Sequence, residues 1–252
     1  MRRVESLMGT VASLVVLDAD PAPEVLDEAF AWLHEADRRF SPYKEDSEVS
    51  RFSRGELRLD DASADLREVL RLCEELRVAS DGAFDAGRWR PDGRPDPTGL
   101  VKGWAAERAG LMLTAGGLDA WCLNVGGDVV VRGETAPGEG WRVGIRHPDD
   151  AQRIVAVLEV RDLAVATSGA YERGEHIVDG RTGKPADGVR SMTVVGPSLT
   201  LADGYATAAF AMGREGVAWV ARIPGYGAAA VTLEERLLSS PLVKELMLPA
   251  EG

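Results

Sequence analysis

The residues best suited to chemistry gather between Ala166 and Gly183, in the segment ATSGAYERGEHIVDGRTG. His176 and Asp179 are suited to holding or moving a proton, and the guanidinium of Arg181 is suited to phosphate oxygens. A lone histidine is more often structural than catalytic, and no GxSxG motif supports a serine-hydrolase triad. The segment therefore indicates a polar, phosphate-handling site whose chemistry depends on what the fold places beside it.

A second candidate site lies further along the chain, where Asp203 and Thr207 are four residues apart in an apolar segment. On a helix this spacing puts both side chains on one face. A carboxylate and a hydroxyl one turn apart can hold Mg²⁺, with water and phosphate oxygens completing the octahedron. The competing interpretation is that Asp203 caps the helix and Thr207 packs inside it.

Two glycine-containing segments and one tyrosine also have two interpretations each. Gly126-Gly127-Asp128 can bring backbone beside a phosphate, or it can be a plain hairpin turn. The segment from Asp96 to Gly103 can present amides and Lys102 to an anion, or it can be a capped helix start with an exposed lysine. Tyr43 can stack on a planar ligand or belong to the core or surface. Neither a P-loop nor a Rossmann glycine pattern is present.

The elements that must position these residues are helices and short strands without regular alternation, which predicts an α+β domain, single but with two lobes. Apolar residues at helical spacing predict helices over 24–39, 64–79, 102–115, 202–212 and 215–222. Runs of β-branched and aliphatic residues predict strands over 11–17, 120–125, 129–132, 141–146, 154–160, 163–166, 176–178, 192–195, 228–233 and 237–239.

Composition narrows the class of protein. The 252 residues carry a net charge of −12, which argues against a nucleic-acid partner, because such binding needs a basic surface. No apolar run reaches the length of a membrane span, and the N-terminal segment is interrupted by Glu5, so we expect a cytoplasmic protein. Cys73 and Cys122 stand in apolar contexts and are expected to be buried free thiols.

Taken together, these motifs resemble the ApbE-like FAD:protein FMN transferase family. The matching segments occur in the family's order and cover the chain almost completely from Met8 to Gly213. They are MGT at 8–10, FSPY at 40–43 with SEVSR at 47–51, GAFD at 82–85, GLVKG at 99–103, NVGGD at 124–128, ATSGAY at 166–171, HIVDGRTG at 176–183 and ADGYAT at 202–207.

The resemblance implies a two-lobed, T-fold-related α+β architecture with mostly antiparallel sheets, flanking helices and an FAD groove between the lobes. It implies transfer of FMN from FAD to a Thr or Ser hydroxyl of an acceptor protein, with Mg²⁺ as cofactor and AMP as leaving group. By motif position, Gly99 (through its carbonyl), Asp203 and Thr207 would bind the metal. His176 and Asp203 would be catalytic. The residues that match FAD-contacting positions are Met8, Tyr43, Ala83, Phe84, Asp85, Asp96, Lys102 and Val178, and Arg181 would add phosphate contacts.

The chain departs from the family pattern in three respects. Only 86–98 separate the GAFD motif from the lysine-bearing helix, where the family usually has a long insertion. Gly180 replaces a usual proline, which is expected to loosen the turn. Many relatives are exported lipoproteins, whereas this sequence shows neither signal nor anchor, which favours a soluble acceptor. Two other functions remain open: an FAD pyrophosphatase that releases FMN and AMP, and a non-catalytic FAD-binding protein.

Overall fold

The computed structural model describes residues 1–87, 96–169 and 177–249. The helices are α1 (Pro23–Phe40), α2 (Glu48–Ser53), α3 (Ala64–Ala79), α4 (Thr98–Ala115), α6 (Leu199–Ala211), α7 (Glu215–Val220) and α8 (Pro241–Leu246), with a short 3₁₀ turn at Leu59–Asp61. The strands are β1 (Arg2–Leu7), β2 (Thr10–Val16), β3 (Trp121–Val125), β4 (Asp128–Arg132), β5 (Trp141–His147), β6 (Asp150–Val160), β7 (Ala164–Gly169), β8 (Val178–Asp179), β9 (Lys184–Pro185), β10 (Val189–Gly196), β11 (Gly227–Thr232) and β12 (Leu237–Ser239).

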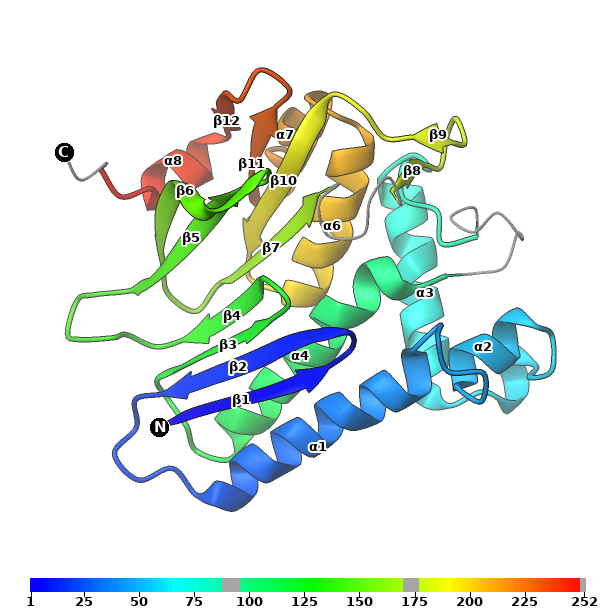
Figure 1. Cartoon of the computed structure of the whole chain (residues 1–252), viewed down its shortest axis with the longest axis horizontal. Helices are drawn as coiled ribbons and strands as arrows, with labels where there is room; N and C mark the ends of the chain where they lie inside the picture. The colour runs from blue at the N-terminus through cyan, green and yellow to red at the C-terminus, as the bar shows by residue number, and fades with distance from the viewer. Residues whose placement is uncertain (88–95, 170–176, 250–252) are drawn as a thin grey trace.

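One eight-stranded sheet forms the centre, in the order β1-β2-β3-β4-β7-β10-β11-β12 (Figure 1). Every neighbouring pair in it is antiparallel. Its halves β1–β4 and β7–β12 are joined by two residue pairs, Val129 with Val165 and Val130 with Ala164, and by the Val131 amide, which donates to the Leu163 carbonyl at 3.1 Å. The backbone junction between the halves is therefore short, and side chains near it have a large part in fixing their relation.

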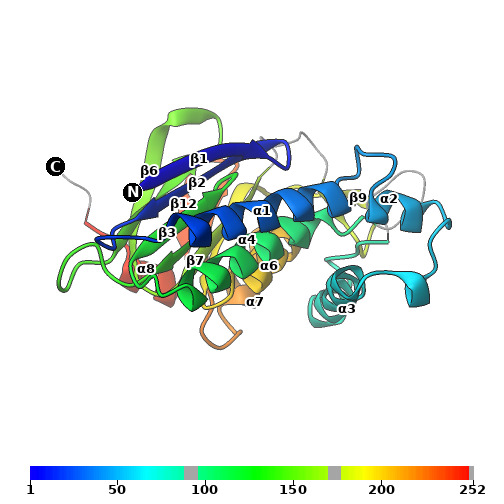
Figure 2. The same ribbon diagram turned by 90° about the horizontal axis from the view of Figure 1, so that it is seen from below.

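Helices α1, α4 and α6 cover one face of the sheet and lie side by side in the view from below (Figure 2). Small residues dominate the buried positions of α4 and α6, which lets these two helices approach closely. Leu14, Leu123 and Trp104 are among the fully or almost fully buried side chains of this main core. The opposite face is covered in part by the β5–β6 hairpin and α8, through a smaller core that includes Leu158 and Val243.

The α+β class with antiparallel sheets is confirmed, and so are most predicted elements, with shifts at their ends. Two short helices, α2 and α8, were not predicted, because each has a single buried residue and so lacks an apolar stripe at helical spacing. The helix predicted from Lys102 begins four residues earlier, at Thr98. The first turn of this helix follows a polar loop, so apolar residues at helical spacing did not indicate where the helix begins.

The chain start was also predicted incompletely, because 2–7 forms a separate edge strand, β1, whose exposed residues are Arg2, Val4 and Ser6. Met8 and Gly9 make a two-residue turn between β1 and β2, with φ of 53° and 69°. Two positive φ values in succession are what a type I′ hairpin turn requires. In the described part of the chain, no helix combines the length and apolarity that crossing a bilayer needs.

Candidate functional site

A pocket of about 560 Å³ opens where the β1–β2 and β3–β4 turns meet the end of α1 and the start of α4. Lys102 and Arg146 are its two cationic lining residues. The remaining lining residues are Met8, Gly9, Thr10, Val11, Ser13, Ala36, Asp37, Phe40, Ser41, Pro42, Tyr43, Thr98, Val101, Asn124, Gly126 and Gly127. Predicted contacts Met8, Tyr43 and Lys102 are thus brought together from three distant segments.

Two residues that line the pocket have unusual features: Met8 has a positive φ angle, and the side chain of Tyr43 is exposed. Met8 adopts a left-handed backbone, which costs a non-glycine residue about 1 kcal/mol and persists only where the surroundings impose it. Tyr43 is 82% exposed although it is a large aromatic side chain. The hairpin turn accounts for the conformation of Met8, and the exposed ring of Tyr43 is available to a planar ligand.

The start of α4 is built by the segment predicted to meet an anion. The carboxylate Oδ1 of Asp96 accepts a hydrogen bond from the Thr98 amide at 3.0 Å, which ties the loop to the first turn. The Asp96 amide donates to the carbonyl of Ala86 at 2.7 Å. The carboxylate of Asp96 is therefore bonded to the first amide of α4, whose N-cap is Pro97, and its predicted FAD contact stays a prediction.

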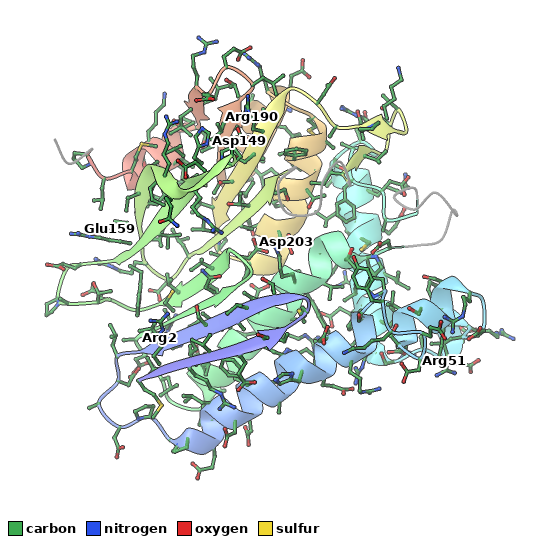
Figure 3. All side chains as sticks on the ribbon, in the orientation of Figure 1. Arg2, Arg51, Asp149, Glu159, Arg190 and Asp203 are labelled. Carbon is green, nitrogen blue, oxygen red and sulfur yellow. The ribbon has the colours of Figure 1, made fainter. Side chains whose placement is uncertain are left out.

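The oxygen atoms of Gly99, Thr207 and Ser168 meet between α4, α6 and β7. The Thr207 hydroxyl lies 3.4 Å from the Gly99 carbonyl and 3.2 Å from the Ser168 hydroxyl. Asp203 is 95% buried one turn earlier on α6, where that helix approaches α4 (Figure 3). The cap of α6 is Ser198, so the interpretation of Asp203 as a helix cap is wrong. Carboxylate, hydroxyl and carbonyl oxygens are the donors that Mg²⁺ prefers, so this set fits the predicted metal.

Gly103 explains how Asp203 comes so close to the start of α4. A Cβ at Gly103 would lie 2.6 Å from the Leu199 carbonyl oxygen and 2.7 Å from the Asp203 Cβ. The Gly103 amide donates to Asp203 Oδ2 at 2.8 Å. In a regular helix that amide donates to the carbonyl of residue 99, so the carboxylate competes with Gly99 for this donor.

Glu107 fixes the same two helices one turn further along. Its Oε2 accepts from the Ser198 hydroxyl at 3.0 Å and from the Thr200 amide at 3.1 Å, and it also accepts from the Thr200 hydroxyl. A carboxylate at a helix N-terminus satisfies amides that the helix leaves unpaired. Glu107 therefore holds the first turn of α6 against α4.

Lys102 is not the exposed lysine of the alternative interpretation. Its Nζ lies 3.0 Å from Oδ2 of Asp128, whose side chain is fully buried. The other oxygen, Oδ1, accepts from the Thr167 amide at 3.1 Å. Burial raises the pKa of Asp128, while Lys102 and the Thr167 amide act in the opposite direction.

The Gly126-Gly127 segment is a hairpin turn, with φ of 62° and 99°, and it lines the pocket as well. The two interpretations of this segment are therefore compatible. Because Asp128 follows the turn directly and pairs with Val125, the turn also sets the position of the carboxylate that meets Lys102.

The β8–β9 turn packs against the segment after α3, and neither segment is among those that line the pocket. Asp179 accepts from Arg181 Nε and Nη2, both at 2.9 Å, and from its amide at 2.9 Å. Burial opposes ionisation, but these bonds and the charge of Arg181 hold the pKa of Asp179 below its usual value. Part of the Arg181 guanidinium is thus already paired with a carboxylate.

Gly180 does not simply loosen this turn, because the turn packs closely on 82–85. Its amide donates to the Ala83 carbonyl at 3.2 Å, and a Cβ there would lie 2.3 Å from the Gly82 carbonyl oxygen. Proline could not donate that hydrogen bond. Ala83 and Phe84 are fully buried, so their side chains face the core.

The remaining predicted contacts are placed as follows. Asp85 accepts from the Gly87 amide at 2.9 Å, and Val178 pairs with Pro185. His176 lies outside the described residues, and its catalytic role stays a prediction. Cys73 and Cys122 are free thiols as expected, but only Cys73 is buried and Cys122 is half-buried. Loss of solvent contact raises their pKa to about 12 and about 11, which keeps them protonated.

One more group of potential ligands lies at the far ends of β5 and β11, formed by His147, Asp149 and Glu235. The Asp149 amide donates to His147 Nδ1 at 3.2 Å, which leaves the ring proton on Nε2. Asp149 is paired with Arg190, beside it in Figure 3, and Glu235 lies 3.5 Å from Arg153. A protonated Nε2 and two neutralised carboxylates do not favour a cation here.

Sequence reasoning missed Ser168, Asp128, Glu107 and Arg146 as parts of the site. Ser168 stood in the first segment, whose chemistry was assigned to His176, Asp179 and Arg181. Asp128 stood in a turn motif whose partner, Lys102, lies on another element. For Glu107 and Arg146 the sequence carried no signal, because a charged residue on a helix or strand is usually solvent-facing.

Comparison with known proteins places the chain. The model of the ApbE family matches residues 8–88 and 90–230. A FAD:protein FMN transferase of Treponema pallidum is 36% identical over 160 residues, which are 56% of this chain and 44% of that protein. One from Vibrio cholerae is 29% identical over 239 residues, covering 73% of this chain and 72% of the relative.

Solved structures agree with the fold. The flavinyl transferase ApbE of Pseudomonas stutzeri, in its apo form, superposes with a TM-score of 0.82 at 25% identity, covering 98% of this chain and 96% of that one. The ApbE protein of Thermotoga maritima has a TM-score of 0.83 at 20% identity, with 99% of both chains covered. Aligned segments span less than half of several curated relatives, the Treponema protein among them. With the family model matching nearly the whole chain, this protein belongs to the ApbE family.

Proposed function

We propose that this protein transfers FMN from FAD to a Ser or Thr hydroxyl of an acceptor protein, in an Mg²⁺-dependent reaction that releases AMP. The observation that carries the proposal is the oxygen set of the buried Asp203 and Thr207 side chains and the Gly99 carbonyl, which lies one helix turn from the pocket lysine Lys102. A site that only bound flavin would not need a buried carboxylate beside two further oxygen donors. Membership of the family supports the same activity.

The reaction forms a phosphoester bond between the acceptor oxygen and the FMN phosphorus, and it breaks the bond from that phosphorus to the oxygen of AMP. Mg²⁺, held by Asp203, Thr207 and the Gly99 carbonyl, would neutralise charge that develops on the pyrophosphate. Lys102 adds positive charge at the pocket wall. His176, by its motif position, would accept the proton of the acceptor hydroxyl.

The test is incubation with FAD and Mg²⁺, with and without an acceptor protein of one of the relatives, followed by intact-mass spectrometry. An acceptor mass gain that matches a phosphoester-linked FMN, with AMP released, supports transfer. Free FMN formed at the same rate without acceptor indicates an FAD pyrophosphatase instead. Binding of FAD without either product indicates a carrier protein, and both outcomes overturn the proposal.

A variant pair connects the activity to the metal site. Asp203→Asn is expected to lower the rate of FMN transfer roughly 100-fold or more, because it removes the charged metal ligand. Asp187→Asn, a change of the same chemistry at an exposed position, is the matched control and should leave the rate unchanged.

The expected cytoplasmic location stays a prediction, which cell fractionation tests.

A further inference from the structure

Asp128 follows the Gly126-Gly127 turn directly, and its carboxylate contacts two elements outside its own hairpin. Its side chain is fully buried and is not among the residues that line the pocket. A buried carboxylate is costly unless it is paired and hydrogen-bonded. Both of its oxygens serve other elements: Oδ2 faces Lys102 of α4 at 3.0 Å, and Oδ1 accepts the Thr167 amide of β7 at 3.1 Å.

These two contacts fall at the short junction of the sheet. The backbone pairing of β4 with β7 consists of Val129 with Val165 and Val130 with Ala164. One residue before Val129, the Asp128 carboxylate reaches the amide of Thr167, two residues beyond Val165. The side chain thus adds a hydrogen bond between the sheet halves beside the paired residues, and from the same carboxylate it meets the ammonium of Lys102.

Resting on the proposed function, we propose that Asp128 is the positioning residue for Lys102: it holds the lysine ammonium at the pocket wall, in register with the β7 strand, so that FAD meets a cation already in place. A lysine side chain has four rotatable bonds and loses much rotamer freedom when a ligand orders it. With its ammonium held by a buried carboxylate, that loss occurs on folding and not on FAD binding.

The test is a double-mutant cycle of Asp128→Asn, Lys102→Met and the double variant, with KM for FAD and kcat measured at saturating Mg²⁺. Each single change is expected to raise KM roughly tenfold and to alter kcat little. The double variant is expected to match Lys102→Met, because Asp128 acts only through the lysine. Independent effects, with KM of the double variant rising about as the product of the two single effects, overturn the proposal.

Two comparisons separate positioning from general damage. Asp162→Asn removes an exposed carboxylate that lies 3.5 Å from Arg132 and should leave KM unchanged. Asp128→Glu keeps the charge and should raise KM less than Asp128→Asn. An equal rise in KM for both Asp128 variants overturns the proposal, because packing would then matter rather than charge.

The ion pair also has a readout that needs no flavin. Denaturant unfolding of the same four proteins is expected to show that the double variant loses less stability than the two single losses combined, since both remove one pair. If the losses of unfolding free energy in the two single variants simply add up in the double variant, Asp128 and Lys102 do not interact. If the unfolding cycle shows this coupling but the wild type neither binds FAD nor transfers FMN, the proposed function fails while the Asp128–Lys102 pair stands.

Discussion

At the scale of single residues, the charged groups of the site are held by partners before any ligand arrives. Lys102 is held by Asp128, and Arg181 is held by Asp179 through its backbone amide and its side chain. Such pairing reduces the net positive charge available to a phosphate, but it fixes the orientation of the cationic group that would bind the phosphate. Orientation is what a site gains when its ligand-binding groups are already ordered.

The Asp179–Arg181 pair predicts how stability depends on pH. Because the pKa of Asp179 is lowered in the folded state, its contribution is present above its ordinary pKa and is lost as the pH falls through the lowered value. Asp179→Asn should cost about 1 kcal/mol of unfolding free energy at pH 7. That difference should shrink as the pH falls below about 4.

Denaturant unfolding of the wild type and the variant at pH 7 and pH 3 measures this difference. Asp187→Asn, at an exposed position, serves as the control and should cost little at either pH. If Asp179→Asn costs as much stability at pH 3 as at pH 7, the stabilisation does not come from the ionised Asp179 carboxylate and its pairing with Arg181.

At the scale of elements, the site depends on how closely α4 and α6 approach. Gly103 allows the approach, the Asp203 carboxylate bonds across it, and Glu107 caps α6 from α4. Helix α6 carries Asp203 and Thr207, the two predicted metal ligands that would bind through their side chains. The register of α6 against α4 therefore determines where these side chains lie relative to the Gly99 carbonyl.

Gly103→Ala is therefore expected to push Asp203 and the Leu199 carbonyl away from α4. Overpacking of this kind costs about 1–3 kcal/mol of stability. The Mg²⁺ concentration for half-maximal FMN transfer should rise as well, because the ligands separate. The measurements are denaturant unfolding and a Mg²⁺ titration of the rate. Leu111→Ala on the same helix, where the leucine is 64% exposed, should alter neither, and an unchanged Mg²⁺ titration for Gly103→Ala would contradict this account.

At the scale of the whole molecule, the candidate site lies around the junction of the two sheet halves. The pocket is lined in part by turns of the first half, and the Ser168 hydroxyl of the second half lies 3.2 Å from the Thr207 hydroxyl of the oxygen set. A ligand that contacts both would add connections where the backbone pairing is short. Ligand binding should then stabilise the entire fold and not just one loop.

We accordingly expect FAD with Mg²⁺ to raise the melting temperature as a single transition. A ligand at 100 times its dissociation constant adds about 2.7 kcal/mol to the free energy of unfolding. Differential scanning calorimetry with FAD alone, and with FAD plus Mg²⁺, separates the two contributions. Asp203→Asn should lose the Mg²⁺-dependent part while keeping a shift from FAD. An equal Mg²⁺-dependent shift in this variant would place the metal elsewhere.

The sequence by itself determined features that depend on neighbours along the chain. The spacing of Asp203 and Thr207 places them on one helix face, and Gly126-Gly127 forms a hairpin turn, because helix periodicity and turn chemistry act over a few residues. The α+β class and the order of most elements followed for the same reason. The motifs, taken together in order, indicated the family that the comparisons then showed.

Only the tertiary structure decided which of these groups meet. Gly103 and Asp203 are 100 residues apart, Ser168 and Thr207 are 39 apart, and Lys102 and Asp128 lie on different elements. Their contacts follow from strand order and from the distance between two helix axes, which depend on packing of the whole core. No local pattern contains that information, so a carboxylate in a turn motif became recognisable as the partner of the pocket lysine only in the folded chain.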